Sequence, residues 1–566
     1  MPLRPGRVLA CLIAAALLAP SLPAASTAEV SGPYLAARTA IRSGDFREAA
    51  AYYTRALVRE PSNPMLLDGA LSAQVGQGGI EAAIPISQRI VALGGRTLAS
   101  ASVRLADLAA RGQYDALLAD LAAGGGIGPL PDTLIEGWAE AGAGRMAEAL
   151  GDFDRAAAMP GLRPFGLYHK ALALALAGDF EGADAALAAE PGGFRTTRRG
   201  AVAHAQILSQ LERNDDAIAA LDLVFGAEPD AEADALRAAL TARTPVPFTI
   251  VTTPRDGMAE TFYTLAAALQ GEASDDQVLI YARIAQYLRP DHAEAHLMTG
   301  SILHAMRQYA LAIESYRMIP ASSPAALAGE LGRVQALEAA GRTDEATAVL
   351  RALVASHAEV PRVHMALGDT LRRQSAFAEA AEAYSRAIAL IGPPEPRHWS
   401  LYYSRAIAWE RAKEWDKAES DFRQALALNP DQADVLNYLG YSLLELGRNI
   451  GDAMELIERA VALAPDSGHI VDSLAWGLFL LGRYDEAVEP MERAALLMPV
   501  DPVVTDHLGD VYWSVGRRIE AQFQWRRALS FEPEAELAER IRRKLDIGLD
   551  AVLAAEGAPP LAARGQ

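Results

Sequence analysis

The chain has 566 residues and a formal net charge of −20, from 72 acidic and 52 basic side chains. No basic face emerges along the sequence that could neutralise phosphates, so we expect no nucleic-acid partner. Hydrophobic residues make up 51% of the chain, and the abundance of alanine among them suits close packing of one helix on another. Solvated acidic helix faces account for the charge.

The first 28 residues have the pattern of a secretory signal peptide. Arg4 and Arg7 precede an apolar run over residues 8–19, and small residues at 26–28 offer a cleavage site. The apolar run is shorter than the roughly 20 residues that a membrane-spanning helix needs. We therefore expect residues 1–28 to be removed and the mature chain to lie in a bacterial periplasm.

The only cysteine of the chain, Cys11, leaves a lipoprotein as the alternative to a secreted protein without a lipid anchor. Cys11 follows Leu9 and Ala10, a faint lipidation pattern that would make the mature protein an outer-membrane lipoprotein. The apolar run lies mostly after Cys11, however, whereas a lipidated cysteine ends such a run. Cleavage after Ala28 would remove Cys11 and leave no thiol in the mature chain.

A unit of 34 residues recurs along most of the chain. In the last unit, Gly509 marks the place where two helices touch, Tyr512 is expected to fill the gap beside it, and Pro533 closes the unit. This period indicates antiparallel helix pairs stacked as a solenoid, since no single pair could bury its apolar face alone. The units open near Val30, Pro64, Leu98, Leu130, Pro164, Arg198, Ala259, Ala293, Leu327, Pro361, Trp399, Ala433, Gly468 and Pro502.

These marks resemble those of the tetratricopeptide repeat (TPR). A small residue at each helix crossing lets the backbones approach, and an aromatic ring fills the wedge beside it. The resemblance implies an all-α fold, a TPR superhelical solenoid of about 14 helix pairs. The same small and aromatic slots recur as Gly300/Tyr309/Ala312/Tyr316, Gly368/Phe377/Ala380/Tyr384/Ala387 and Gly440/Gly447/Ala460.

The array is expected to be interrupted near residues 244–258. The stretch from Thr244 to Pro254 combines three prolines with β-branched residues, which excludes a regular helix. We expect a degenerate TPR array over residues 29–243 before this interruption, and a more regular C-terminal TPR array over residues 259–533 after it.

An amphipathic helix is expected after the last repeat. Leu537, Ile541 and Leu545 recur every four residues among basic side chains, which predicts a helix over residues 534–554 that caps the exposed end of the solenoid. The same basic amphipathic pattern leaves peripheral contact with a membrane surface as an alternative. Residues 555–566 are expected to form a flexible tail.

The sequence offers no catalytic signature. It lacks a nucleophile elbow, a phosphate loop, a His-Glu-x-x-His helix and paired metal-binding cysteines. His292 and His296, with Glu294 between them, are the nearest metal candidate, but we expect surface histidines there, with His292 at a repeat boundary outside any helix. We expect no cofactor, no metal and no enzyme activity; the enzymatic alternative is a hydrolase that uses Asp506 and Asp510 as acid and base.

The concave face is the surface expected to bind a partner. In a stacked helix pair, positions 2, 5, 6, 9, 12 and 13 of the first helix point into the superhelical groove. Aromatic and polar side chains mix there as in peptide-binding surfaces, although large aromatic residues at this spacing also pad neighbouring helices. The predicted partner-binding residues are Asn437, Tyr441, Asp472, Trp476, Asp506, His507, Asp510, Trp513, Arg372 and Arg373.

The acidic members of this set indicate the charge of the ligand. Asp472, Asp506 and Asp510 would repel one another in one groove, and a basic or hydrogen-bonding ligand would relieve that repulsion. TPR domains that grip a free C-terminal carboxylate use Lys, Arg and Asn at these positions. Only Asn437 fits that pattern, so a carboxylate ligand is not expected.

The architecture resembles periplasmic TPR adaptors that deliver substrates to carboxyl-terminal processing proteases, and the resemblance rests chiefly on the C-terminal units. It implies a non-enzymatic scaffold whose partners are other proteins, an envelope protease or an assembly machinery. Members of that adaptor type are commonly lipoproteins, from which this chain departs. A subunit of a polysaccharide-export, secretion or outer-membrane assembly machine is the alternative, and the fold alone does not choose the pathway or the oligomeric state.

Overall fold

The computed structural model describes residues 28–190, 192–226, 230–558 and 561, and this part of the chain is almost entirely helical. The predicted signal peptide lies outside the described residues except for Ala28, which begins the first helix. Most of the predicted tail also lies outside them. The chain divides into two compact units, one that runs to Val349 and one that begins at Leu350, so the division falls within the second predicted array.

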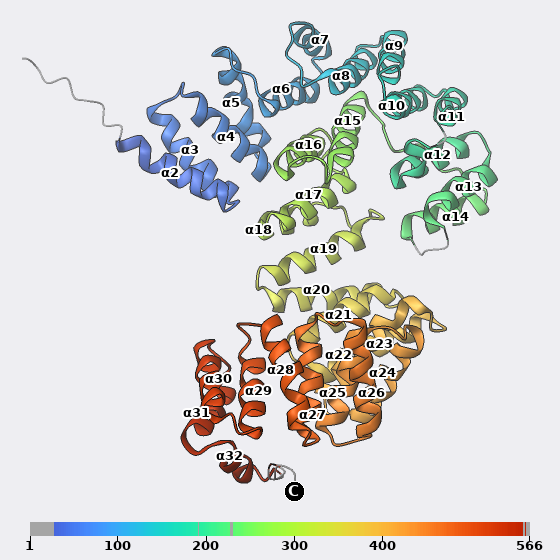
Figure 1. Cartoon of the computed structure of the whole chain (residues 1–566). Helices are drawn as coiled ribbons and strands as arrows, with labels where there is room; N and C mark the ends of the chain where they lie inside the picture. Colours follow the sequence, from blue (N-terminus) through green and yellow to red (C-terminus); the bar gives the residue numbers. More distant parts are fainter. Residues whose placement is uncertain (1–27, 191, 227–229, 559–560, 562–566) are drawn as a thin grey trace, which may run out of the picture. The chain divides into compact units, whose positions relative to one another are not determined.

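The N-terminal unit is built of antiparallel helix pairs, with one 3-10 turn, η1 (Phe194–Thr196). Its helices are α2 (Ala28–Arg42), α3 (Phe46–Arg59), α4 (Pro64–Gln77), α5 (Ile80–Ala92), α6 (Leu98–Ala110), α7 (Tyr114–Ala122), α8 (Pro129–Gly142), α9 (Met146–Ala157), α10 (Arg163–Leu176), α11 (Phe180–Ala188), α12 (Arg198–Gln210), α13 (Asn214–Phe225), α14 (Ala231–Thr241), α15 (Pro254–Leu269), α16 (Asp275–Leu288), α17 (Ala293–Ala305), α18 (Tyr309–Arg317) and α19 (Ala326–Ala339) (Figure 1).

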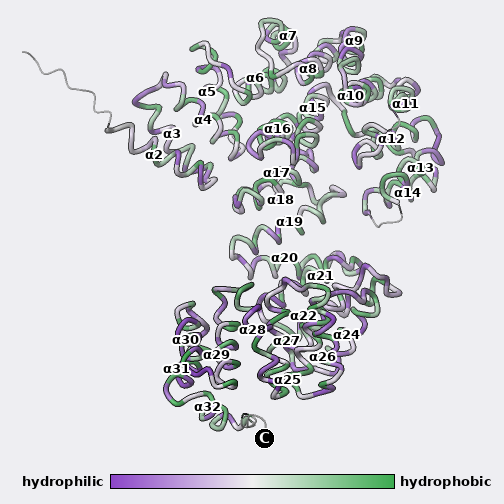
Figure 2. The backbone as a smooth tube through the Cα atoms, in the orientation of Figure 1, coloured by the Kyte–Doolittle hydropathy of each residue, from purple (hydrophilic) through white to green (hydrophobic). Residues whose placement is uncertain are grey.

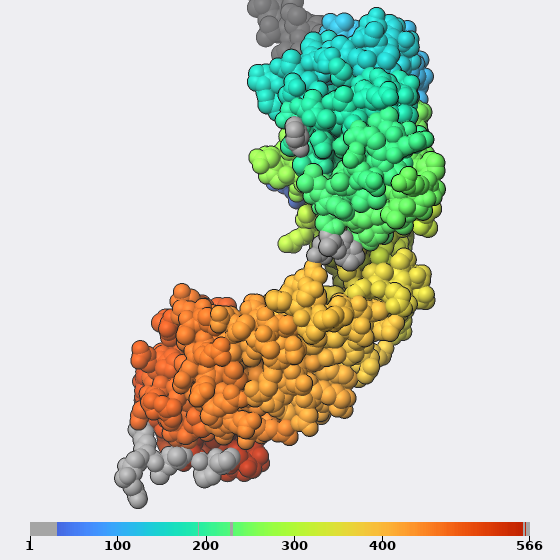
Figure 3. Space-filling model, turned by 90° about the vertical axis from the view of Figure 1, so that its right-hand side faces the viewer, coloured from blue at the N-terminus to red at the C-terminus, as the bar shows by residue number. Residues whose placement is uncertain are grey.

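The C-terminal unit continues the paired pattern after α20 (Thr343–Ser356), which spans the division between the units. Its residues run in chain order from yellow to red in Figure 3, and Figure 2 shows hydrophobic and hydrophilic residues mixed along the helices. None of the described helices combines the length and the hydropathy that a membrane span requires. The helices are α21 (Pro361–Arg373), α22 (Phe377–Ile391), η2 (Pro396–His398), α23 (Trp399–Arg411), α24 (Trp415–Leu428), α25 (Ala433–Glu445), α26 (Ile450–Leu463), α27 (Gly468–Leu480), α28 (Tyr484–Leu497), α29 (Pro502–Ser514), α30 (Arg518–Ser530), α31 (Ala535–Ile547) and α32 (Leu549–Ala555).

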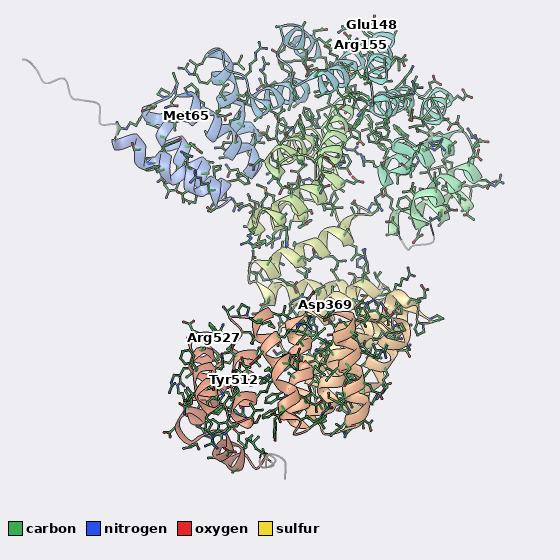
Figure 4. The ribbon with its side chains drawn as sticks, in the orientation of Figure 1. Met65, Glu148, Arg155, Asp369, Tyr512 and Arg527 are labelled. Atoms are coloured by element: carbon green, nitrogen blue, oxygen red, sulfur yellow. The ribbon has the colours of Figure 1, made fainter. Side chains whose placement is uncertain are left out.

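Small residues let the two helices of a pair approach closely. A Cβ added at Gly368 would lie 2.6 Å from the Tyr384 ring, and one added at Gly509 would lie 2.4 Å from the Trp525 ring. Both predicted slots are therefore places of close helix contact. The ring that packs on Gly509 is that of Trp525, however, and not that of Tyr512, which lies further along α29 (Figure 4).

An arginine at the same place in three successive repeats ties each repeat to the one before it. The arginines are 34 residues apart, and each donates to a proline carbonyl in the turn before its own repeat. These bonds satisfy carbonyl oxygens that the helix ends leave without a partner. The pairs are Arg459 with Pro430 at 3.2 Å, Arg493 with Pro465 at 2.7 Å, and Arg527 with Pro499 at 2.6 Å.

Two helices of the N-terminal unit lie inside the array that precedes them. α15 packs on α6, α8 and α10, and α16 packs on α4, α5 and α6. Figure 1 shows α15 and α16, in green, within the arc formed by α2–α14. The concave face of the N-terminal array is therefore filled by the same chain, an arrangement that the repeat period does not predict.

The turn into α15 is shorter than the interruption predicted over residues 244–258. Residues 242–253 form no regular helix, and α15 begins at Pro254. Thr253 and Asp256 cap the helix reciprocally: the Thr253 hydroxyl accepts the Asp256 N–H at 3.2 Å, and the Asp256 carboxylate accepts the Thr253 N–H at 2.9 Å. A proline suits the first helical position because no intrahelical bond needs the backbone N–H that proline lacks.

A buried ionic network fastens α15 and α17 to the N-terminal array. The Arg199 Nε–H donates to both carboxylate oxygens of Glu260 at 2.8 Å, and the guanidinium lies 3.1 Å from Glu294. The Tyr168 hydroxyl donates to Glu260 at 2.9 Å. The His292 ring lies 3.4 Å from Glu260 and 3.3 Å from Glu294. Since Glu260 is 0% exposed, the network joins α10, α12, α15 and α17 away from water.

Burial and charge act in opposite directions on this network. Burial alone would raise the pKa of Glu260, but Arg199 and His292 lower it to about 2. The pKa of Glu294 is also lowered, because the same two groups outweigh its burial. Burial lowers the pKa of Arg199, and the two carboxylates outweigh that effect and raise it. Both carboxylates and the guanidinium are therefore charged in the folded unit at neutral pH.

After the last repeat, the described residues form two helices rather than the single capping helix predicted over residues 534–554. Gly548 separates α31 from α32 with a φ of 84°, a left-handed conformation that favours glycine. A Cβ added there would lie 2.8 Å from the Trp513 ring. The spacing of apolar residues continues through the break, which is why the sequence pattern does not reveal it. Ile541 and Lys544 of α31 are buried against the last repeat, as a cap requires.

Replacing Gly509 by alanine is expected to destabilise the C-terminal unit by about 1–3 kcal/mol, because the added Cβ would overlap the Trp525 indole. Gly451→Ala is the matched control, since that helical glycine of the same unit has open space around it and should change stability by less than about 1 kcal/mol. Urea unfolding followed by circular dichroism measures both, and equal values would contradict the close contact.

Replacing Arg199 by methionine should cost the N-terminal unit about 3–5 kcal/mol, because it leaves the buried Glu260 carboxylate and the partly buried Glu294 carboxylate without their cation. The adjacent Arg198 pairs with Asp230 and Glu232 but is 42% exposed, so Arg198→Met should cost only about 0–1 kcal/mol. Thermal unfolding of both variants provides the comparison. A loss for Arg199→Met as small as that of its neighbour would show that the network does not hold α15.

The pKa of Glu260 predicts how the stability of the N-terminal unit depends on pH. The folded pKa of about 2 is below the ordinary value of 4.5, so the carboxylate stabilises the fold fully above pH 4.5 and loses its contribution as the pH falls toward 2. The difference in unfolding free energy between the natural chain and Glu260→Gln should therefore shrink across that range. A difference that stays constant from pH 7 to pH 3 would contradict the assignment.

Candidate functional site

In the N-terminal unit, side chains of α12 hold an extended segment of the same chain. The Ser209 hydroxyl accepts the Val246 N–H at 3.0 Å, and the Gln210 amide donates to the Val246 carbonyl at 2.6 Å. The Gln206 amide oxygen accepts the Thr249 N–H at 2.9 Å, and the amide nitrogen donates to the Thr249 hydroxyl at 3.1 Å. The groove therefore holds this segment largely by its backbone groups.

The residues of α12 that make these bonds occupy the positions that the repeat register assigns to the groove. Counted from Arg198, Gln206 is position 9, Ser209 is position 12 and Gln210 is position 13. Arg199, which anchors the ionic network of α15, is position 2. The rule that positions 2, 5, 6, 9, 12 and 13 of a first helix face the groove thus holds in the degenerate array as well. A grip on backbone groups is how a groove binds an extended peptide of variable sequence.

The C-terminal groove has two parts, which we name by their helices: the near end on α21, α23 and α25, and the far end on α27 and α29. At the far end the Lys544 ammonium lies 2.7 Å from Asp506 Oδ2 and 2.7 Å from both oxygens of Asp510. These two aspartates are 1% and 0% exposed. The repulsion expected between them is relieved by a basic side chain of the same chain, which the sequence analysis did not foresee.

Asp506 and Asp510 are enclosed by the protein. Burial and Asp510 raise the pKa of Asp506 to about 6, although Lys544 acts in the opposite direction. The Trp525 Nε1–H donates to Asp510 at 2.9 Å. Asp506 Oδ1 is buried without a hydrogen-bond partner among the described residues. The far end therefore contains an enclosed ammonium site with one acceptor that its occupant does not use.

Ring stacking and an ion pair join α27 to α29. His507 Nδ1 lies 3.0 Å from Asp472; burial lowers the pKa of His507, but Asp472, Asp506 and Asp510 together outweigh burial and raise it. The Trp476 ring stacks on His507 with centroids 3.9 Å apart and on Phe479 with centroids 4.7 Å apart. Trp476 and His507 therefore pad adjacent first helices, the alternative considered for the aromatic residues, and both keep part of their surface exposed.

Trp513 connects the far end to the C-terminal helix. Its indole N–H donates to Asp550 of α32 at 2.7 Å, and its ring lies 5.3 Å from the Trp525 ring. Gly548, at the break between α31 and α32, lies against the same indole. Trp513 is thus a docking point for the two C-terminal helices, in addition to lying at a groove position.

The predicted residues of the near end are less enclosed. Arg372 is half-buried and Arg373 is exposed on α21. Asn437 and Tyr441 are half-buried on α25, and burial together with Glu445 raises the pKa of Tyr441. The ten predicted residues thus fall into two sets, four at the near end and six at a far end that Lys544 partly fills.

The histidines considered as metal ligands have structural partners. His292 precedes α17 as its N-cap, which confirms its place at a repeat boundary. The expectation that these are surface histidines is wrong, since His292 and His296 are only 2% and 5% exposed. His296 Nε2 lies 2.9 Å from the Pro290 carbonyl. Among the residues that the structure describes, no group of three or more histidine, cysteine or acidic side chains could hold a metal ion.

The sequence analysis did not predict that Lys544 and residues of α12 take part in the grooves. Lys544 lies three residues after Ile541, so both belong to one face of α31, and this spacing could have placed the lysine on the buried side. Gln206 and Ser209 could have been found by applying the positional rule to the N-terminal array. Their occupant could not have been found this way, because no periodic signal links α12 to residues 246–249.

Four segments of the chain match the family model for the tetratricopeptide repeat, residues 34–93, 276–326, 331–396 and 403–468. The chain is also similar to TPR repeat-containing protein PA4667 of Pseudomonas aeruginosa, with 25% identity over 251 residues that cover 44% of this chain and 35% of that protein. The human protein O-mannosyl-transferase TMTC3 is 24% identical over 190 residues, which cover 30% of this chain and 20% of that protein. The chain thus spans about a third or less of these relatives.

Two solved structures resemble the fold. A chain of the APC/C hetero-tetramer Cut9–Hcn1 aligns with a TM-score of 0.37 and 13% identity, over 92% of this chain and 96% of that chain. YrrB, described as a TPR protein with an unusual peptide-binding site, aligns with a TM-score of 0.27 and 18% identity, over 34% of this chain and 97% of that chain. With helix pairs along the described residues and four segments that match the family model, the chain contains tetratricopeptide repeats.

Proposed function

We propose that this protein is a non-enzymatic scaffold that binds an extended segment of a partner protein in the near end of its C-terminal groove. The observation that carries the proposal is the grip of α12 on residues 246–249, in which groove positions hold backbone groups of an extended chain. The same positions recur in α21, α23 and α25. Residues of the same chain already fill the N-terminal groove, so the C-terminal groove is the candidate for a partner.

The side chains of the near end suit such a segment. Arg373 and Arg411 are exposed, and Tyr403 and Tyr441 are half-buried. Tyrosine and arginine combine apolar contact area with hydrogen-bond donors, and they are enriched where interfaces gain most of their affinity. Asn437, at position 5 of α25, adds an amide that can bond to a peptide backbone.

We further propose that the scaffold works in a bacterial periplasm, where it presents partner proteins to an envelope protease. The amino-terminal pattern of Arg4, Arg7 and the following apolar run supports secretion. The likeness of the C-terminal repeats to those of protease adaptors supports the presenting role. The enclosed state of Asp506 and Asp510, both bound to Lys544, is a reason to favour a scaffold over a hydrolase.

Site-specific photocrosslinking in intact bacterial cells tests whether the groove binds partner proteins. With a photoreactive phenylalanine derivative at Tyr441, we expect partner proteins to be captured at least about tenfold more strongly than with the same group at Phe523, which is 68% exposed on α30, outside the groove. Adding Arg411→Ala should reduce capture at Tyr441, whereas Arg448→Ala, an exposed arginine beside the turn after α25, should not.

Mass spectrometry of the captured proteins then decides between the two pathways. Recovery of a processing protease with its substrates supports the adaptor role, and recovery of export or outer-membrane assembly components instead overturns it. Equal capture at Tyr441 and Phe523 would contradict the groove as the binding surface.

A further inference from the structure

Two carboxylates and two basic side chains meet on the concave side of α29. Lys544 lies 2.7 Å from Asp506 and from Asp510, and Arg540 Nη1 lies 3.9 and 3.7 Å from the same two residues. Lys544 is 1% exposed and Asp510 is 0% exposed. The formal charges of the four groups cancel, which lowers the cost of burying the two aspartates and Lys544, while Arg540 stays partly exposed and also bonds to Glu556 at 3.1 Å.

The aspartates of this cluster stand at groove positions of their repeat. Counted from Pro502, Asp506 is position 5 and Asp510 is position 9. Position 9 of α12 is Gln206, which binds a segment of the chain's own backbone. Lys544 therefore occupies the C-terminal groove where a ligand side chain would lie.

The cluster has the chemistry of a lysine pocket. Three carboxylate oxygens surround the ammonium, which matches the three donors of a lysine. The Trp525 ring lies 5.8 Å from the Lys544 Nζ and adds a cation–π contact. Asp506 Oδ1 is buried and has no hydrogen-bond partner among the described residues, so the pocket holds an acceptor for one more N–H of a bound segment.

The helices that deliver Lys544 fully bury only a few side chains, and Leu537, Leu545 and Leu553 pack partly buried against the same core. In α31 the buried residues are Ala538, Ile541 and Lys544, and in α32 they are Leu549 and Val552. The two helices are joined at Gly548, whose φ is 84°. A small set of buried contacts on each side of a glycine allows this pair to open at a lower free energy than the repeats themselves.

We propose that the pocket of Asp506, Asp510 and Trp525 binds a lysine side chain of the partner protein, and that α31 and α32 occupy it in the free chain. The inference rests on the proposed function, because the pocket is the far end of the same groove. A partner that carries a lysine at the right distance must displace Lys544. Only chains in which the pocket is open can bind it, so its apparent affinity is the intrinsic affinity multiplied by the fraction of open chains.

A fluorescent peptide of residues 535–555 tests the pocket in the full-length protein. This peptide carries four acidic and four basic residues, so its binding does not depend on attraction to the acidic chain as a whole. In the double variant Leu549→Ala/Val552→Ala, which loosens the C-terminal helices without touching the pocket, the peptide should bind at least about tenfold tighter than to the natural chain. Ile547→Ala, at a residue that is 51% exposed on α31, is the matched control and should bind as the natural chain does.

Acetylation of the lysine separates a lysine pocket from general helix docking. A peptide with acetylated Lys544 should bind the double variant at least about tenfold more weakly, and Asp510→Asn in the double variant should have the same effect. Circular dichroism confirms that each variant is folded. Equal binding of the acetylated and unmodified peptides would overturn the lysine pocket.

Capture at Tyr441 distinguishes this inference from the function on which it rests. We expect partner capture to increase in the double variant and to fall when Asp510→Asn is added. If capture at Tyr441 is strong but responds to neither change, the lysine inference is wrong and the groove function stands. If no partner is captured at Tyr441 in the natural chain, the proposed function itself is wrong, whatever the peptide does.

Discussion

A stack of helix pairs leaves its concave face without a neighbour to cover it, and this constraint shapes both units. Each pair buries one side against the next repeat, but the groove positions of the first helices remain open unless something fills them. In the N-terminal unit, α15, α16 and the segment before them fill the groove. At the far end of the C-terminal unit, α31 inserts Lys544 between two aspartates. The chain therefore supplies ligands to its own grooves.

The contact that fills the N-terminal groove and the contact that Lys544 makes in the C-terminal groove differ in how firmly they are held. This difference suggests that they have different roles. Glu260 is bound by Arg199 and Tyr168, and its helix packs on three helices of the array. Such a network is costly to break, because removal of one member leaves buried charges without partners. Lys544 also meets two carboxylates, but the helices that carry it fully bury only four other side chains, beside three partly buried leucines that pack on the same core. The N-terminal contact thus suits a permanent core, and the C-terminal contact suits a replaceable occupant.

The sequence predicts the parts of the fold that depend on neighbouring repeats, and fails where distant parts meet. The close contact at Gly509 follows from a small residue and an aromatic ring within one repeat, although the ring is that of Trp525. The contact between Gly257 and Trp138 joins residues far apart in the chain and has no periodic signal. At the site, the aspartates of the groove predicted a basic ligand of the right charge. Its source, Lys544, lies on α31, two helices further along the same chain.

The central claim is that the chain itself fills the N-terminal groove and leaves the near end of the C-terminal groove open. Hydrogen–deuterium exchange of the full-length protein, with and without a captured partner, tests this claim most directly. The account predicts new protection in α21, α23 and α25 when the partner binds, and no change in α12 or in residues 246–249, which are already hydrogen-bonded. New protection in α12 without protection in α25 would contradict it, because the partner would then have entered the groove that the chain fills itself.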